Sequence, residues 1–392
     1  MKRTIKDLVG LKGKRVLVRV DFNVPVDENG RISDTTRIDL SLPTINYLVK
    51  QQARVILVSH LGRPKGYEVH KSLWPVAMYL SQELPCPVGF CTGLLNEEAK
   101  YRIEHLQNGC VLLLENTRFF EGEESCDMAF SKELANLADI YVNDAFATAH
   151  RENASTFGVA RILPNAIGLL MEKEIQNLDK IVKNPQSPFV AVIGGSKVSS
   201  KLDILNSLIE KADTLIIGGA MAYTFMKALG EETGESLVED DMLDNADAIL
   251  QKAEALGKKI LLPIDHICTE GSNKKTAIRV KEMKSSMVGY DIGPDTVKYY
   301  AKEIARAKQV FWNGPMGKFE EERFAAGTQG VAVSIAQSKA VSVVGGGDTV
   351  AAVNNMGIGR YFTFVSTGGG ATMEYIQQGS LPCIDVIQEK II

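Results

Sequence analysis

The chain has 392 residues, a length that suggests two or three domains. Hydrophobic residues make up 45% of the chain and charged residues 23%, which is typical of a soluble globular enzyme. The net charge of −4 gives no bulk attraction for nucleic acid or anionic membranes, so we expect neither as a partner. The N-terminus (MKRTIKDLVG) lacks a signal-peptide core and no run reaches the ~18 apolar residues of a membrane span, which predicts a cytoplasmic protein. The six cysteines form no C-x-x-C pair, which favours free thiols.

Short β-branched runs alternate with longer helical segments along the chain. In the first half these runs occupy residues 16–20, 55–59, 111–114 and 140–142. In the second half they occupy residues 190–193, 214–217, 259–262, 310–312, 341–344 and 362–365. Continuous apolar runs of this length are typical of parallel strands buried on both faces, with helices in the crossovers. The pattern predicts an α/β protein with two doubly wound parallel sheets.

The segment 170–183 (LMEKEIQNLDKIVK) predicts a helix between the two halves. Its apolar residues Met171, Ile175, Leu178 and Val182 recur at helical spacing, and Asn184-Pro185 ends the pattern. An ordinary crossover helix within one large sheet would look the same. We interpret it as a connector at 171–185, between a first domain at 1–170 and a second domain at 186–374.

Cationic residues follow several strands of the first half. Ligands in open α/β sheets bind beyond the carboxyl ends of the strands, where arginine forks suit phosphate and carboxylate. A single exposed arginine would be unremarkable, but several in equivalent positions indicate a site for a small, highly anionic molecule. They are Arg37 in the loop after the first strand, His60, Arg63, Arg118 and Arg151. Asp144 fits a helix cap or turn as well as it fits a functional carboxylate.

Glycine-rich turns follow the strands of the second half instead. Glycine allows backbone N–H groups to approach phosphate or a base closely, and helix N-termini attract anions. One such turn is weak evidence, but several in one domain indicate a nucleotide platform. They contain Gly194-Gly195, Gly218-Gly219, Gly314-Pro315, Gly345-Gly346-Gly347 and Gly368-Gly369-Gly370.

Two lysines and one aspartate add charge to these turns. Lys197 and Lys201 are four apart at the start of a predicted helix, where cations oppose the helix dipole, which favours phosphate binding over two solvated lysines. Asp348 precedes another predicted helix and could cap it, but a Mg²⁺ ligand is the sharper interpretation. The absence of G-x-x-x-x-G-K-[ST] excludes a P-loop enzyme. The absence of G-x-G-x-x-G weakens the interpretation as an NAD-dependent dehydrogenase. His150-Arg151-Glu152 without a following D-F-G excludes protein-kinase chemistry.

The sequence resembles the phosphoglycerate kinases along nearly its whole length. The segments that carry the resemblance are 19–25 (RVDFNVP), 59–64 (SHLGRP), 115–119 (ENTRF), 143–151 (NDAFATAHR), 194–202 (GGSKVSSKL), 312–320 (WNGPMGKFE), 345–349 (GGGDT) and 366–371 (STGGGA). Ala147 departs from the glycine that many members have.

The resemblance implies two Rossmann-like domains that face each other across a cleft, with a C-terminal tail (375–392) that returns to the first domain. It implies a monomer that uses Mg²⁺ with ATP or ADP. The residues that would hold phosphoglycerate are Asp21, Asn23, Arg37, His60, Arg63, Arg118 and Arg151. Those that would hold the nucleotide are Gly194, Gly195, Lys197, Lys201, Gly218, Gly219, Gly289, Pro315, Glu320, Gly346, Gly347, Asp348 and Thr349, with Asp348 as the metal ligand.

The implied reaction is 1,3-bisphosphoglycerate plus ADP giving 3-phosphoglycerate plus ATP, in glycolysis and gluconeogenesis. In the reverse direction the nucleophile is a carboxylate, which is ionised at pH 7, so no general base is needed. The predicted catalytic groups are Arg37, Lys201, Gly369 and Gly370, which would neutralise charge on the transferring phosphoryl group. Asp21 would orient the substrate hydroxyl. Two alternatives stay open: an NAD-dependent dehydrogenase, and a catalytically silent nucleotide-binding or scaffold protein.

Overall fold

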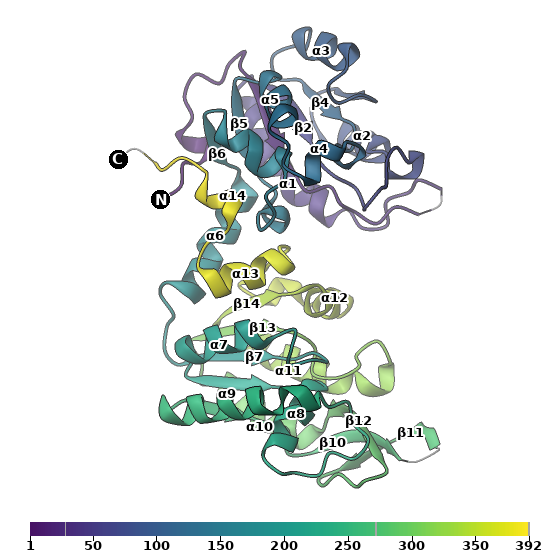
Figure 1. The fold of residues 1–392 in the computed structure, drawn as a ribbon, viewed down its shortest axis with the longest axis vertical. Coiled ribbons are helices and arrows are strands. Elements are labelled where there is room, and N and C mark those ends of the chain that lie inside the picture. The colour runs from purple at the N-terminus through teal and green to yellow at the C-terminus, as the bar shows by residue number, and fades with distance from the viewer. Residues whose placement is uncertain (28, 271–272, 391–392) are drawn as a thin grey trace. The chain divides into compact units, whose positions relative to one another are not determined.

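The computed structural model describes residues 1–27, 29–270 and 273–390, so the last two residues of the predicted tail 375–392 lie outside the described residues. The chain divides into two compact units (Figure 1). The first contains Met1–Gln176 and the segment from Ser380 onward, and the second contains Asn177–Gly379. No helix within the described ranges combines the length and the apolar character needed to cross a bilayer.

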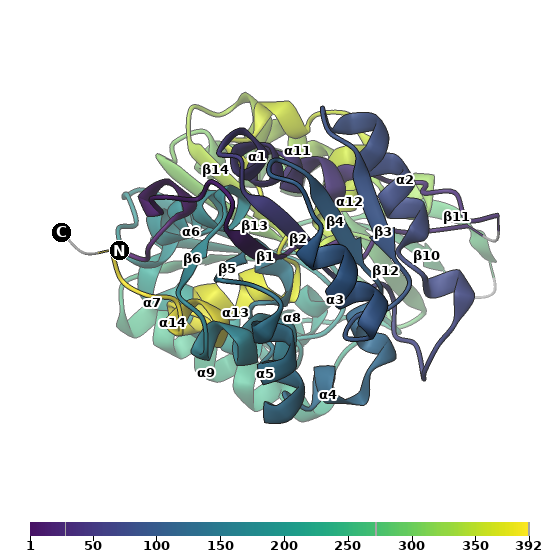
Figure 2. The same cartoon turned by 90° about the horizontal axis from the view of Figure 1, so that it is seen from above.

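The first unit contains one parallel six-stranded sheet. Its strands are β1 (Arg15–Arg19), β2 (Arg54–Val58), β3 (Val88–Cys91), β4 (Val111–Leu114), β5 (Ile140–Asn143) and β6 (Asn165–Ile167). Their order is β3-β4-β2-β1-β5-β6, which can be followed from right to left in Figure 2. The chain moves outward from β1 to one side and then returns to add β5 on the other. The carboxyl ends of β1 and β5 therefore flank a topological switch point.

Helices and short turns surround this sheet. The helices are α1 (Thr36–Lys50), α2 (Trp74–Glu83), α3 (Glu97–Glu104), α4 (Glu121–Glu124), α5 (Met128–Asn136), the beginning of α6 (Leu169–Val182) and α14 (Pro382–Asp385). The short 3₁₀ or π turns are η1 (Ile5–Asp7), η2 (Val69–Lys71), η3 (Thr117–Phe119), η4 (Phe146–Thr148), η5 (Ala154–Gly158) and η6 (Val159–Arg161). A core of alternate strand residues, such as Val16, Val18, Val55 and Leu57, packs against Ile45 and Leu48 of α1.

The second unit repeats the architecture with its own parallel six-stranded sheet. Its strands are β7 (Phe189–Ile193), β8 (Thr214–Ile217), β9 (Lys259–Leu261), β13 (Gln309–Asn313), β14 (Val341–Gly345) and β15 (Phe364–Val365), in the order β15-β14-β13-β7-β8-β9. The switch point here lies between β7 and β13. A three-stranded antiparallel sheet, ordered β11-β10-β12, adds β10 (His266–Glu270), β11 (Asn273–Val280) and β12 (Met287–Ile292).

Two helical layers accompany the second sheet. One layer contains α7 (Leu202–Lys211), α8 (Met221–Ala228), α9 (Leu243–Ala255) and α13 (Gly370–Gln378), and the other contains α10 (Pro294–Ile304), α11 (Ala326–Gln337) and α12 (Gly347–Asn355). The short turns are η7 (Asp240–Met242), η8 (Glu322–Phe324) and η9 (Gly359–Tyr361). Trp312 and Tyr300 are the largest side chains of the core between β13 and α10–α11.

These sheets confirm the predicted α/β class with two parallel sheets, and the predicted runs correspond to strands within one or two residues. The run 362–365 was too long, because only Phe364–Val365 pair with β14. Sequence analysis missed β3, β6 and the antiparallel sheet. The predicted helix 170–183 is α6, which begins at Leu169, and Thr44 Oγ1 accepts a hydrogen bond from Leu169 N at 2.8 Å. The boundary between the units falls within this helix.

Candidate active site

In the first unit, the polar residues that follow the strands gather at the carboxyl edge of the sheet. Asp21 follows β1, His60 follows β2, and Arg118 lies in η3 after β4. All strands are parallel, so these positions share one edge. Burial and the charges of four arginines lower the pKa of His60 well below its ordinary value of 6.5. Those arginines are Arg19, Arg118, Arg37 and Arg151, which places a strong positive field around the imidazole.

Arg37 reaches this edge from a helix, which corrects its predicted place in a loop. It lies in the first turn of α1, which begins at Thr36, and the Asp34 carboxylate accepts a hydrogen bond from Thr36 N at 2.9 Å. The helix continues past Pro43, so local sequence rules argue against it while the buried apolar face supports it. The Arg37 guanidinium forms an ion pair with the carboxylate of Asp21, which is itself almost fully buried.

Hydrogen bonds with two candidate substrate-binding residues, Asn23 and Arg118, hold the loop that contains Gly62. Asn23 Oδ1 accepts from Gly62 N at 2.9 Å, and Arg118 Nη1 donates to Gly62 O at 2.7 Å. Arg118 also forms an ion pair with Glu124 at 3.0 Å, and burial lowers its pKa. A hollow of about 480 Å³ beside this loop is lined by Asn23, Leu61 and Gly62, with neighbours from 24–27 and 70–71. Arg63 and Arg151 are exposed.

Asp144 has a structural role at this edge. Its Oδ1 accepts hydrogen bonds from Leu170 N at 2.9 Å and Met171 N at 3.1 Å, so it caps α6. The side chain is fully buried, and burial raises its pKa to about 7. Of the two interpretations that the sequence left open, the structure shows the helix cap.

In the second unit, the turns that follow β7, β8 and β13 approach each other too closely for side chains. Gly219 has φ +70°, and a Cβ there would lie 2.4 Å from Gly195 O. Gly314 has φ +94°, and its Cβ would lie 2.1 Å from Gly194 O. Glycine is required at both positions because either contact would force the backbone apart. Gly194 and Gly218 are buried and crowd against Pro315 O and Met316, so they form the floor of the turns.

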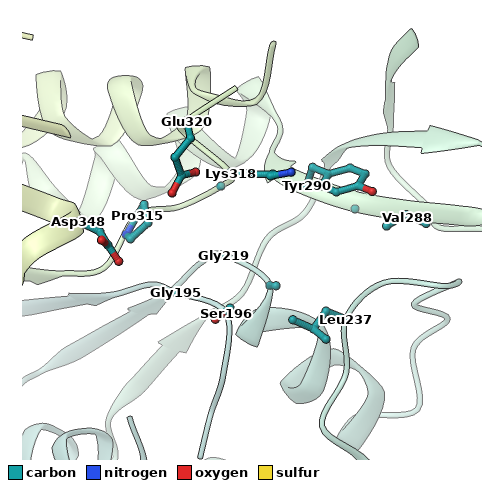
Figure 3. Close-up of a pocket in the computed structure, with 13 residues that line it drawn as sticks. Gly195, Ser196, Gly219, Leu237, Val288, Tyr290, Pro315, Lys318, Glu320 and Asp348 are labelled. Carbon is teal, nitrogen blue, oxygen red and sulfur yellow. The ribbon is translucent and has the colours of Figure 1, made fainter. Parts of the chain in front are cut away.

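A pocket of about 340 Å³ opens above these turns (Figure 3). Of the predicted nucleotide residues, it is lined by Gly195, Gly219, Gly289, Pro315, Glu320 and Asp348. Sequence analysis missed Leu237, Val288, Tyr290 and Lys318, which form its end away from Asp348 (Figure 3). Val288 and Tyr290 belong to β12 and Leu237 to the loop before η7, which are not carboxyl ends of parallel strands. Lys318 lies in the loop after β13, within the quoted segment 312–320, but its side chain was not singled out. The pocket thus has a charged end and a largely apolar end.

Lys201 and Lys197 do not share a helical face, which corrects the predicted helix at 197–201. Helix α7 begins at Leu202, with Lys201 as its N-cap residue. Residues 199 and 200 bond outside any helix: Ser199 N and Oγ donate to the carboxylate of the distant Glu239 at 3.0 and 2.6 Å, and Ser200 Oγ donates locally to Lys197 O at 3.0 Å. A local side-chain to backbone bond such as that of Ser200 competes with helix formation.

The two lysines also differ in their surroundings. The Lys201 ammonium donates to Asn313 Oδ1, and burial lowers its pKa while the charge of Asp348 opposes that shift. Lys197 is exposed.

Asp348 lies in the first turn of α12, which begins at Gly347, and its side chain does not cap the helix. Its exposed carboxylate borders the pocket, while the neighbouring Thr349 Oγ1 accepts a hydrogen bond from Gly314 N at 2.6 Å. Gly346 precedes the helix with φ +93°. Within the described residues, no group of three or more His, Cys, Asp or Glu side chains is placed to hold a metal. A cation held here would therefore need other ligands besides Asp348.

The last glycine run begins α13. Gly369 is the N-cap residue with φ +54°, and Gly370 is the first helical residue. Ser366 Oγ accepts a hydrogen bond from Gly368 N at 3.2 Å and is itself bonded to Thr372 Oγ1 at 2.6 Å. The backbone N–H groups of a helix N-terminus lack partners within the helix, so this turn can bind an anion.

The fold has counterparts among solved structures. A phosphoglycerate kinase from Coxiella burnetii is 40% identical with a TM-score of 0.90, and one from Pyrococcus horikoshii OT3 is 33% identical with a TM-score of 0.84. Each match covers 98% of this chain and 98% of the other chain. The architecture is therefore that of the two-domain α/β phosphotransferases to which these structures belong.

Sequence comparison narrows the class further. Residues 5–379 match the phosphoglycerate kinase family. The phosphoglycerate kinase of Dictyoglomus turgidum is 48% identical over 99% of this chain and 100% of its own length, and that of Finegoldia magna is 47% identical over the same shares. The chain belongs to the phosphoglycerate kinase family, whose known role is phosphoryl transfer in glycolysis. Membership of this family supports ATP:3-phosphoglycerate 1-phosphotransferase activity, in place of the NAD-dependent dehydrogenase that the sequence analysis had left open.

Proposed function

We propose that the two units divide the substrates of this phosphotransferase, the first binding 3-phosphoglycerate and the second binding the nucleotide. The observation that carries the proposal is the contrast between the carboxyl edges of their parallel sheets. Arginines and His60 gather at the first, whereas glycine turns and a pocket with an apolar end gather at the second. The phosphoglycerate-binding domain is thus the first unit and the nucleotide-binding domain is the second, with their boundary inside the proposed connector 171–185. Residues 375–379 of the predicted tail 375–392 belong to the second unit, and only the segment from Ser380 onward belongs to the first.

In the first unit, Arg118, Arg151, Arg63 and His60 hold the phosphate and carboxylate of 3-phosphoglycerate. Arginine suits these groups because its planar fork forms paired hydrogen bonds. Asp21 and Asn23 bind the hydroxyl side of the substrate. The Asp21 carboxylate accepts a hydrogen bond from Asn23 N at 3.2 Å and is oriented by Arg37, so it can accept a further bond from the substrate hydroxyl without removing a proton.

In the second unit, the base lies at the end of the pocket formed by Leu237, Val288 and Tyr290. Glu320 lies between the two ends and faces the ribose, and the phosphates extend toward Gly195 and Asp348 (Figure 3). Lys201, Lys197 and the N-termini of α12 and α13 bind the phosphates by charge and by backbone N–H groups.

The charged end of the pocket fits Mg²⁺. Magnesium binds through one or two carboxylates together with substrate phosphates and water, and Asp348 offers one exposed carboxylate there. When bound, the ion neutralises phosphate charge. Asp348→Asn should therefore raise the Mg²⁺ concentration needed for half-maximal activity. An unchanged Mg²⁺ concentration would contradict the proposal that Asp348 is a metal ligand.

Catalysis consists of alignment and charge neutralisation, because the attacking carboxylate is already ionised. Arg37, Lys201 and the backbone of Gly369 and Gly370 stabilise charge on the transferring phosphoryl group. Since the substrates bind to separate units, the units must approach during turnover. The chain passes between them twice, within α6 and between Gly379 and Ser380, and these are the hinge positions. We expect a cytoplasmic monomer.

The test is a coupled assay for ADP formation that depends on both ATP and 3-phosphoglycerate. Arg118→Met is the matched variant, because it removes a substrate cation far from the nucleotide turns in the sequence. Turnover in the wild-type chain, with a raised KM for 3-phosphoglycerate and an unchanged KM for ATP in the variant, supports the proposal. MgATP binding without turnover would instead support the silent scaffold protein.

A further inference from the structure

A buried arginine lies directly beneath the candidate phosphoglycerate site. Arg19 is the last residue of β1, and only 1% of its surface is exposed. Its Nε donates to Ser155 Oγ at 2.8 Å, its Nη1 donates to Val20 O, and its Nη2 lies 3.1 Å from His60 Nδ1. With so little exposed surface, Arg19 is not available to touch a substrate.

The charge of Arg19 is compensated through a hydroxyl. Ser155 Oγ donates to Glu123 Oε1 at 2.6 Å, and Ser155 N donates to Glu123 Oε2 at 3.0 Å. Glu123 is fully buried, and no ion pair of Arg19 is present within the described ranges. Arg19, Ser155 and Glu123 thus form a fixed chain whose free end is the Nη2 donor facing His60.

This contact determines which nitrogen of His60 carries the proton. A guanidinium is always protonated and has no acceptor, so His60 Nδ1 must accept with its lone pair. The neutral ring then carries its proton on Nε2. Burial and the surrounding arginines (Arg19, Arg118, Arg37 and Arg151) also oppose a second proton. The Asp21 carboxylate lies 3.9 Å from Nδ1, too far for a hydrogen bond, and is engaged by Arg37.

The other nitrogen of His60 is left for a ligand. Within the described residues, Nε2 makes no hydrogen bond to the protein. Carboxylate and phosphate oxygens only accept hydrogen bonds, so an Nε2–H group attracts them. The opposite tautomer would present a lone pair to the anion and repel it.

We propose that Arg19 is a positioning residue that holds His60 in its Nε2–H tautomer, so that the ring donates a hydrogen bond to an oxygen of the bound phosphoglycerate. The inference rests on the proposed function in one respect, the placement of phosphoglycerate beside His60. The tautomer itself is a property of the free protein and can be measured without any substrate.

The first experiment measures the tautomer in the full-length chain. Long-range ¹H–¹⁵N spectra of imidazole-labelled protein distinguish a protonated from an unprotonated ring nitrogen, and His60→Gln assigns the signal among the five histidines. We expect an unprotonated Nδ1 and a protonated Nε2 from pH 6 to 8. In Arg19→Met the signals should move toward a mixed tautomer or a protonated ring, and in Arg19→Lys, which keeps a cationic donor, they should move less. A proton on Nδ1 in the wild-type chain overturns the proposal without reference to any variant.

The second experiment compares two amide replacements of His60. The amide nitrogen of glutamine can occupy the position of Nε2, whereas that of asparagine can occupy only the position of Nδ1. We expect the KM for 3-phosphoglycerate to be about 10–100-fold lower in His60→Gln than in His60→Asn, the range typical of a hydrogen bond to a charged group. Equal KM values in the two variants would overturn the donor role. Failure of the wild-type chain to bind 3-phosphoglycerate would instead contradict the proposed function, while the tautomer result would stand.

Discussion

The carboxylate of Asp21, at the end of β1, is ion-paired with the guanidinium of Arg37, which reaches it from the first turn of α1. The pair joins a buried acid to a partly exposed base at the sheet edge. Asp21 therefore holds Arg37 at the proposed substrate site while leaving part of its fork for a ligand.

We predict that Arg37→Ala lowers kcat much more than it raises the KM for 3-phosphoglycerate. Its charge should matter most when phosphoryl transfer develops charge, and loss of one such donor commonly costs about 10²–10³ in rate. Arg37→Lys should recover only part of the lost kcat, because an ammonium cannot form the paired hydrogen bonds of a guanidinium. Arg63→Ala is the comparison variant. Arg63 is exposed and is expected to bind the substrate in the ground state, so its loss should mainly raise the KM for 3-phosphoglycerate. Steady-state kinetics with both substrates varied would separate the effects on kcat and KM. A normal kcat in Arg37→Ala would show that Arg37 only binds the substrate and does not act on the transition state.

Arg37 also shows where reasoning from sequence reached its limit. The predicted strands 111–114 and 214–217 agree with β4 and β8 because their residues are buried throughout and, except for Thr214, apolar. Arg37 was placed in a loop, although α1 continues through Pro43. Tertiary burial of Ile38, Ile45 and Leu48 outweighs the local effect of that proline.

The missed elements share weak local signals. Strand β3 (VGFC) is only partly buried because it lies at the edge of its sheet. Strand β6 has three residues and begins with a polar one. In the antiparallel sheet, β12 is too interrupted by Gly289 and polar residues to give a continuous apolar run. The apolar end of the nucleotide pocket depends on that sheet, so Val288 and Tyr290 could not be found from the ends of parallel strands.

A second prediction concerns the pH dependence of stability. Burial raises the pKa of Asp144 from its ordinary 3.8 to about 7, so between these values the folded chain keeps a proton that the unfolded chain has lost. The free energy of unfolding should therefore fall as pH rises through this interval, by up to about 4 kcal/mol.

Asp144→Asn should remove that slope, because an amide keeps the cap acceptor but does not titrate. Urea midpoints at pH 5, 6, 7 and 8 would show the difference. Asp127→Asn, which replaces the exposed cap of α5, is the control for weakening a helix cap without a buried carboxylate. Parallel pH profiles for the wild-type chain and Asp144→Asn would contradict the raised pKa.

A third prediction concerns the two lysines of the 194–202 loop. Lys201 is largely buried and bonded to Asn313 at the sheet edge, whereas Lys197 is exposed. We expect Lys201→Met to lower kcat by about 10²-fold, because a preorganised cation acts on the transition state. Lys197→Met should mainly raise the KM for ATP, since an exposed charge is screened by water. Equal losses of kcat in both variants would show that burial does not separate their roles.

A fourth prediction uses the crowded backbone of the nucleotide turns. Gly219→Ala places a Cβ 2.4 Å from Gly195 O at a positive φ, so the turn must move and the affinity for MgADP should fall at least about tenfold. Gly230→Ala is the matched control, because Gly230 has φ +81° but nothing within 4 Å of the added Cβ. The control should lose stability by a similar backbone strain and still bind MgADP normally. If both variants bind MgADP equally well, the close approach is not needed for the site.

The division of substrates between the units is tested most directly by calorimetric titration of full-length variants with each ligand separately. We predict that Arg118→Met weakens binding of 3-phosphoglycerate at least about tenfold and leaves MgADP binding unchanged, while Gly219→Ala does the reverse. Loss of 3-phosphoglycerate affinity in Gly219→Ala equal to its loss of MgADP affinity would contradict the division.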